Sequence, residues 1–227
     1  MSLAAPNFME NDRNLVSDKL KVIIMAFSDF ENIDQVINKH PLKIKQDRFL
    51  PDVAIQLQEC FLEDINFLMD MKSVDENENF FNDSFIFPFL REAWKRHRKL
   101  KLWSHRPLAY DDDLCGEPDY FVSYLPDDVV DRLINRPVLV INQAKKENFT
   151  QGWGQCLAEM IACQKINDHP EVTIYGIVST GLMWEFSKLQ ESLLTKDSIL
   201  YSINSPHQLF GILDYIFAEC EKRLQKI

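Results

Sequence analysis

Two apolar, β-branched runs separated by a helix-length segment constrain the fold of this chain more than any other feature. The first run, 138–145, begins Val-Leu-Val-Ile, and the second, 172–179, is similarly rich in branched apolar residues. Runs of this kind are typical of strands buried on both faces of a sheet. The segment 150–167 has an apolar stripe at helical spacing, formed by Trp153, Cys156, Leu157, Met160 and Ile161. The sequence therefore predicts a strand, a helix and a second strand around a common core.

The flanking segments extend this unit into an α/β domain with a central mixed β-sheet. Residues 84–99 indicate a helix, and 100–104 and 119–125 indicate strands, so the elements follow the order α-β-β-β-α-β. That order implies helices on both faces of the sheet. Gly181 opens a hairpin into 183–188, and another strand is expected near 199–203. Ser205-Pro206 is a good start for a final helix, whose predicted buried stripe is Leu209, Ile212, Leu213, Ile216, Phe217 and Cys220.

The first seventy residues are predicted to be helical. Leu57, Phe61, Ile65 and Met69 recur at helical spacing, and the polar stretch 72–79 is the best candidate for a loop. We therefore expect a helical extension over residues 1–75, packed on a core domain over residues 76–227. The extension is also a candidate contact for a homodimer.

Composition restricts the classes of function. The chain has 227 residues and a formal net charge of −10, which argues against nonspecific coating of nucleic acid but permits a local basic groove. The apolar run 22–27 is too short to span a bilayer, so no membrane association is expected. The five cysteines form no CxxC pair, and they predict buried thiols in a reducing, cytoplasmic protein. The sequence has no HxxxH, GxGxxG, GxxxxGK or GxSxG pattern, which disfavours zinc, nucleotide-loop and serine-hydrolase chemistry.

Polar residues at the ends of two predicted strands supply the candidate chemistry. Pro118-Asp119 starts one strand, and Gln143-Ala144-Lys145 ends the next. Strand side chains alternate with period two, so Gln143 and Lys145 share a face. With GEPDYFVS, VLVINQAKK, GWGQCLAEM and YGIVSTGLMWEF in this order, the region 83–188 resembles the PD-(D/E)XK nuclease superfamily. The resemblance implies a restriction-endonuclease-like fold with an αβββαβ core.

The resemblance also implies a Mg²⁺-dependent nuclease, with Mn²⁺ as an alternative ion, that cleaves phosphodiester bonds in DNA. By resemblance, Asp119 is the principal metal ligand, Ala144 offers a backbone carbonyl, and Lys145 activates the attacking water. Oxygen ligands suit Mg²⁺, and the metal and the lysine stabilise charge on the phosphate.

Gln143 departs from the family pattern, which has Glu or Asp at this position. An amide oxygen can bind Mg²⁺, but it lacks the charge of a carboxylate and cannot act as a base. Three interpretations follow: an inactive domain that only binds, an active enzyme with a neutral ligand, or an enzyme in which another acid supplies the charge. The alternative to a nuclease is therefore a catalytically inactive binding or assembly protein on the same scaffold.

Three further residues are candidates for the site. Glu159 is the candidate for an acid that has moved onto the helix, and Gln155 resembles a glutamine that many family nucleases place beside the site. At about 100° per residue, both lie away from the middle of the apolar stripe, so a solvated side chain is an equal alternative. Asp83 lies where related proteins carry a supporting acid, although a helix N-cap explains it equally well.

A dense basic run extends from Trp94 to Trp103 and precedes the Asp119 strand. In an acidic protein it is a candidate phosphate-binding patch, which is consistent with DNA as the partner. The alternative is a helix end whose cations complement the helix dipole. Lys146 adds one more cation beside Lys145.

Overall fold

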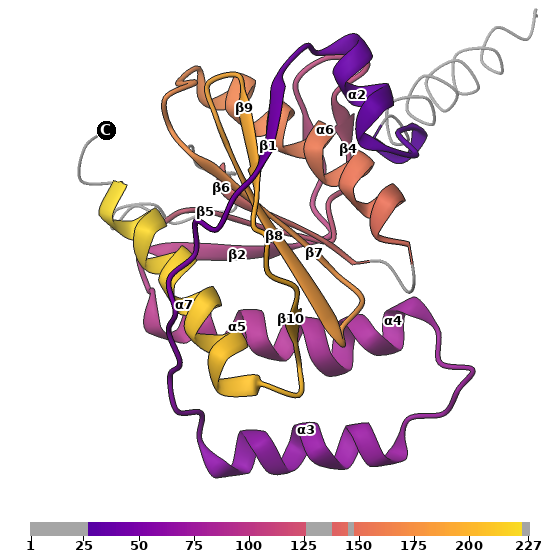
Figure 1. Cartoon of the computed structure of the whole chain (residues 1–227), viewed down its shortest axis with the longest axis vertical. Helices are drawn as coiled ribbons and strands as arrows, with labels where there is room; N and C mark the ends of the chain where they lie inside the picture. Colours follow the sequence, from indigo (N-terminus) through magenta and orange to yellow (C-terminus); the bar gives the residue numbers. More distant parts are fainter. Residues whose placement is uncertain (1–26, 126–137, 145–147, 224–227) are drawn as a thin grey trace, which may run out of the picture.

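A mixed eight-stranded sheet with helices on both faces forms the centre of the molecule (Figure 1). The computed structural model describes residues 27–125, 138–144 and 148–223. The strand order is β1-β9-β8-β7-β6-β5-β2, and β10 pairs with β8 beside this path. The α/β fold class and the mixed sheet flanked by helices are thus confirmed. None of the described helices is both long and apolar enough to cross a membrane.

Apart from β9, which the sequence did not predict, the elements in the second half of the chain lie close to their predicted positions. The strands of the main sheet are β1 (Lys43–Gln46), β2 (Leu100–Ser104), β5 (Tyr120–Tyr124), β6 (Val138–Ala144), β7 (Ile174–Ser179), β8 (Met183–Gln190), β9 (Leu193–Lys196) and β10 (Tyr201–Ser202). A separate pair comprises β3 (Leu108–Ala109) and β4 (Cys115–Gly116). The helical elements are η1 (Phe27–Asp29), α2 (Ile33–Lys39), α3 (Glu59–Met71), α4 (Glu78–Phe81), η2 (Asn82–Ile86), α5 (Phe87–Arg96), α6 (Phe149–Asn167) and α7 (Pro206–Arg223).

Strand directions follow from the length of each connection. β2, β5 and β6 are antiparallel neighbours, whereas β6 and β7 are parallel and are joined by α6. A parallel pair needs a long crossover, and the helix between the two apolar runs provides it. β7 and β8 form the predicted hairpin, in which Gly181 has the positive φ of +84° that favours glycine. The carboxyl ends of β6 and β7 consequently lie at one end of the sheet.

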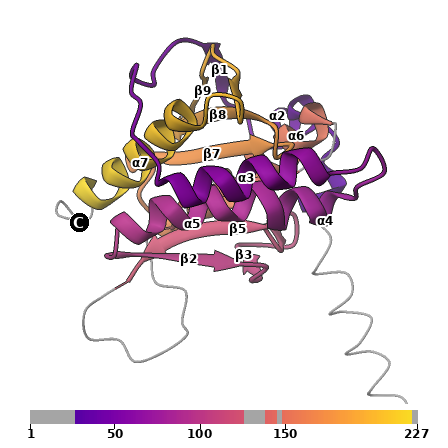
Figure 2. The ribbon, with the colours of Figure 1, turned by 90° about the horizontal axis from the view of Figure 1, so that it is seen from below.

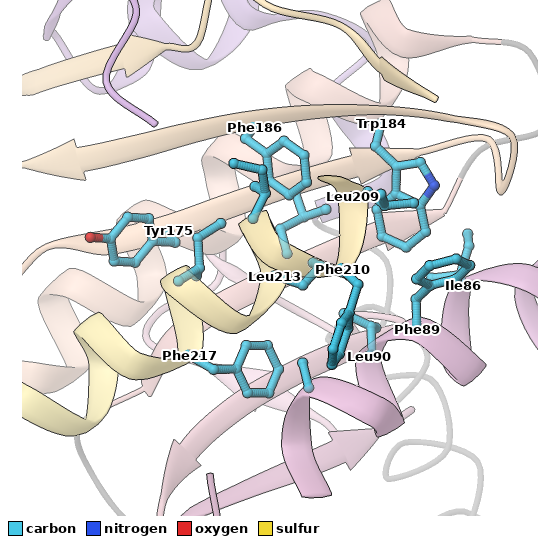
Figure 3. Close-up of a cluster of buried hydrophobic side chains, with 14 of the residues drawn as sticks. Ile86, Phe89, Leu90, Tyr175, Trp184, Phe186, Leu209, Phe210, Leu213 and Phe217 are labelled. Carbon is cyan, nitrogen blue, oxygen red and sulfur yellow. The ribbon is translucent and has the colours of Figure 1, made fainter. Parts of the chain in front are cut away.

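The larger core lies on the face covered by α5 and α7. The apolar stripe of α7 packs between α5 and the strands β7 and β8 (Figure 3). All six predicted residues of this stripe are buried. Helix α3 lies outside α5 (Figure 2), where Phe61 meets Phe89 edge-to-face with ring centroids 5.1 Å apart. The predicted helix with Phe61 and Ile65 on its inner side is therefore confirmed.

Helix α6 covers the opposite face and is enclosed by other elements as well as by the sheet. Asn148 caps its first turn by accepting a hydrogen bond from the backbone N of Gln151 at 3.1 Å. The segment that joins η1 to α2 lies against it so closely that a Cβ on Gly154 would stand 2.6 Å from the carbonyl oxygen of Phe30. The predicted stripe of α6 is buried, and most of the helix outside the stripe is buried too.

The prediction that the first seventy residues are helical is wrong for the segment that joins the sheet. Residues 43–46 form β1, which pairs with β9 in parallel, and the sequence missed both strands. The chain then runs without helix or strand from 47 to 58, where the carboxylate of Asp197 accepts hydrogen bonds from the backbone N of Phe49 and of Leu50, each at 3.0 Å. Residues 1–26 lie outside the described part. The cysteine prediction fails once, because Cys60 is exposed while the other four thiols are buried.

Candidate functional site

The register of β5 and β6 brings the two halves of the motif to the same end of the sheet. Tyr120 pairs with Asn142 in the antiparallel ladder, so one further step places position 119 opposite position 143. On its other side, Gln143 pairs with Val178 of β7, and Ala144, the last residue of β6, pairs with Ser179. The side chains of 138–144 and the whole of Lys145 and Lys146 lie outside the described part. The backbone therefore aligns positions 119 and 143 across neighbouring strands.

Asp119 is held beside a strained histidine. The side chain of Asp119 is 17% exposed, and its carbonyl oxygen accepts a hydrogen bond from the backbone N of His105 at 3.0 Å. The Nδ1 atom of His105 lies 3.8 Å from the Asp119 carboxylate. His105 has a φ of +46°, in the left-handed region that residues other than glycine seldom occupy. A residue in this conformation is kept there by its surroundings, and both of these contacts are to Asp119.

Asp83 and Asp119 are both close enough to act electrostatically on one buried phenol. Burial, and after it the nearby carboxylates of Asp83 and Asp119, raise the pKa of Tyr120 to about 12, although a hydrogen bond with the Ser104 side chain acts in the opposite direction. Asp83 lies in η2, within helical turns that run from α4 into α5, so the N-cap interpretation is wrong. It is an exposed acid at the same end of the sheet as Asp119.

Gln155 and Glu159 are buried, with exposed fractions of 6% and 1%, so the solvated interpretation of both residues is wrong. Cys156 and Met160, which lie before and after Glu159 on α6, contact β7 and so show the level of Glu159 along the strands. A Cβ on Gly176 would stand 3.1 Å from Sγ of Cys156 and 2.5 Å from Sδ of Met160.

Gly176 pairs with Ile141, which is two residues, or roughly 7 Å, before position 143. The backbone of Glu159 therefore lies about level with Ile141 along β6, deeper in the molecule than the row of Asp119, and Gln155 is one turn nearer to that row. The carboxylate of Glu159 adds to the effect of burial in raising the pKa of the Cys156 and Cys163 thiols.

A polar cluster on the next two strands was not predicted. Glu185 pairs with Val178, which itself pairs with Gln143, so it continues the row of Asp119 and position 143 across the sheet. Its carboxylate accepts hydrogen bonds from Nε1 of Trp153 and, at 3.2 Å, from Nζ of Lys196. The ammonium of Lys196 also lies 4.5 Å from the centre of the Trp153 ring. No signal in the sequence joins these residues, because they come from three separate elements.

The first half of the basic run lies at the other end of the sheet. Leu100 pairs with Tyr124 and Ser104 with Tyr120, so the start of β2 is about 17 Å from the level of Asp119. There Arg96 binds Asp214 at 2.6 Å, and the ring of His97 contacts Asp214 and Glu221, each at 3.1 Å. These cations tie α5 to α7, in agreement with the alternative of a stabilised helix end.

Oxygen donors make up the candidate metal site, which suits a hard cation such as Mg²⁺. They comprise the carboxylate of Asp119, the carbonyl of Ala144 at the end of β6, and the amide at position 143. Among the described residues, no group of three or more His, Cys, Asp or Glu side chains is placed to hold a metal ion.

Comparisons with known proteins leave the assignment to the sequence and the geometry. The chain matches no protein-family model and resembles no curated protein closely enough to count as a match.

Proposed function

We propose that this protein is a Mg²⁺-dependent nuclease with a restriction-endonuclease-like core that acts on DNA. The order of elements α5, β2, β5, β6, α6 and β7 supports the proposal, because it reproduces the αβββαβ order of that superfamily. The order β2-β5-β6-β7 within the sheet also supports it, since consecutive core strands are neighbours.

The register that sets position 119 opposite position 143 carries the proposal. In it, Asp119, the carbonyl of Ala144 and the amide of Gln143 hold Mg²⁺, which supplies positive charge at the scissile phosphate. His105 fixes the backbone of Asp119 and so orients its carboxylate. Lys145 is assigned the water-activating role by resemblance, and Asp83 adds negative charge at the same end of the sheet.

The test is cleavage of single- and double-stranded DNA in Mg²⁺ and in Mn²⁺. Asp119→Asn and Lys145→Ala each remove an element of the proposed chemistry, and we expect cleavage to fall by on the order of 100-fold or more. Asp112→Asn is the matched control, because Asp112 is an exposed acid in a loop away from the motif. Cleavage that survives the change at Asp119 or at Lys145 would refute the assignment of these residues.

The second candidate function is binding or assembly without catalysis. It is favoured by the amide at position 143 and by the depth of Glu159, which lies below the row where a replacement acid is needed. Such a protein gives no turnover with any divalent ion. Salt-dependent retention on a nucleic-acid column then separates a nucleic-acid binder from a protein-interaction module.

A further inference from the structure

Cations and aromatic rings alternate along β2, the last strand of the sheet in the described part of the chain. We call Trp94, Lys101, Trp103 and Arg106 the β2 edge surface. The ammonium of Lys101 lies between two indoles, 4.7 Å from the ring centre of Trp94 and 5.6 Å from that of Trp103. The guanidinium of Arg106 lies 5.8 Å from the Trp103 ring centre. Cation–π contacts therefore join the four residues into one continuous strip.

Hydrogen bonds hold both indoles in place. Trp94 donates from Nε1 to the carbonyl oxygen of Leu100 at 2.7 Å, and Trp103 donates to Oγ of Ser123 at 2.8 Å. Trp103 is also stacked on Phe121, with ring centroids 6.1 Å apart and planes at 22°. Both tryptophans stay partly exposed. The strip thus offers fixed aromatic rings to solvent, which lowers the entropic cost of binding a planar group.

A pocket continues the strip at the start of β2. Trp94, Leu100 and Leu125 form its apolar lining, and Lys95 and Arg98 are its cations. Lys95 is neutralised by Glu92 at 2.6 Å, whereas Arg98, Lys101 and Arg106 have no acidic partner among the described residues. The apolar lining of this pocket suits a nucleobase, and the cation beside it suits the phosphate of the same nucleotide.

The other end of the strip reaches the candidate site. Arg106 follows His105, whose backbone and ring both contact Asp119. Trp103 pairs with Phe121, two residues from Asp119 on the same strand, so a ligand that follows β2 arrives at that carboxylate.

We propose that the β2 edge surface and its pocket bind a single strand of nucleic acid and lead it to Asp119. The partly exposed indoles stack on unpaired bases, and the three cations that lack an acidic partner among the described residues meet successive phosphates. A duplex keeps its bases stacked on one another and cannot use the indoles in this way. The inference rests on the proposed function, because it names the form of substrate that reaches the nuclease site.

The first experiment measures binding of a labelled oligothymidylate, an oligouridylate and a DNA duplex in EDTA, where no metal-dependent cleavage occurs. The triple variant Arg98→Ala, Lys101→Ala, Arg106→Ala removes the three cations of the surface and pocket that have no acidic partner in the described part of the chain. We expect it to weaken single-strand binding by at least about tenfold. The slope of log affinity against log salt should also shrink by about 2, which corresponds to about 0.7 for each lost phosphate contact.

A matched triple variant at the opposite edge of the sheet controls for net charge. Lys43→Ala, Lys45→Ala and Arg48→Ala remove the same charge near β1, and we expect unchanged binding. Tryptophan emission gives a second readout. Trp153 and Trp184 are buried, so quenching by the single strand reports on Trp94 and Trp103.

Equal weakening by both triple variants, absence of quenching, or a duplex bound as tightly as the single strands would overturn the inference. The oligothymidylate and the oligouridylate separate DNA from RNA, and binding of either supports it. If Asp119→Asn abolishes cleavage but the β2 triple variant binds single strands as the wild type does, this inference is wrong and the nuclease proposal stands. If the triple variant weakens single-strand binding but the wild type does not cleave DNA with any metal ion, the inference stands and the nuclease proposal is wrong.

Discussion

The glutamine at position 143 decides how much negative charge the end of β6 offers to a cation. Its backbone lies between position 119 of the neighbouring strand and Val178 of β7. The carboxylate of Glu185 is one strand further away and is already paired with Lys196. A Mg²⁺ ion bound in this row, as we propose, would therefore meet one close carboxylate, that of Asp119, together with neutral oxygens. Each additional carboxylate favours such an ion but repels its neighbours when the ion is absent.

Gln143→Glu should strengthen Mg²⁺ binding and, in the absence of the ion, add repulsion between carboxylates. Without metal, we expect the variant to be less stable by about 1 kcal/mol, because two carboxylates facing each other raise the pKa of one of them. With Mg²⁺ at about 100 times its dissociation constant, binding to the folded state returns about 2.7 kcal/mol. The measurement is the unfolding midpoint of both proteins with and without Mg²⁺. An equal Mg²⁺-induced shift in both would mean that position 143 does not face the metal.

At the scale of elements, α6 is fixed by backbone on one side and by the sheet on the other. Gly154 faces the segment between η1 and α2, and a Cβ there would stand 2.6 Å from the backbone N of Asn32 and from the carbonyl O of Phe30. Backbone atoms cannot turn aside as the end of a side chain can. Position 154 therefore requires glycine because the backbone of the η1–α2 segment lies so close to α6, although glycine lowers helix stability relative to alanine.

Gly154→Ala should lower the free energy of unfolding by about 1–3 kcal/mol, because overpacking outweighs the gain in helix propensity. In an open helical position the same change would raise stability by about 1 kcal/mol. Urea unfolding of the two proteins gives the sign directly. A more stable variant would show that η1 and α2 move away from α6 at little cost.

The packing of α6 also explains which predictions from the sequence succeeded. Hydrophobic periodicity found α6 and α7 because each has a side that faces the core, and continuous apolar runs found the central strands β6 and β7. It misplaced Gln155 and Glu159 because it assumes that the other side of a helix faces water. It missed β1 because all four of its residues are exposed, so no alternation of apolar residues marks it. Pairing with β9 defines this strand, and pairing is invisible in a single sequence.

At the scale of the whole molecule, the two ends of the sheet carry different polar networks. Asp119, Tyr120 and His105 lie at one end. His97 and Asp214 lie at the other, where they join α5 to α7. The ring of His97 is buried between two carboxylates of α7, so its removal deletes two contacts that tie the end of α5 to α7.

His97→Ala should destabilise the protein by about 2 kcal/mol, since hydrogen bonds to charged groups are among the stronger ones. Its effect should be confined to stability, and the Mg²⁺-induced shift of the unfolding midpoint should stay as in the wild type. His169→Ala is the matched control, because the His169 side chain is half exposed and, within the described part of the chain, its ring forms an ion pair only with Glu171, two residues along the chain. A lost metal response in His97→Ala would show that the two ends of the sheet are coupled.

The pairing of β1 with β9 has a consequence for the way the chain is made. The backbone N of Leu50 binds the Asp197 carboxylate across a separation of 147 residues, directly after the parallel ladder between the two strands. On a ribosome, the segment 43–50 emerges long before its partner exists, and it must wait without a sheet until β9 has been synthesised. Contacts of such high sequence separation slow folding and leave strand edges open in the meantime. The two lysines of β1 place charge on this waiting segment, and charged side chains disfavour the pairing of an open strand edge with another chain.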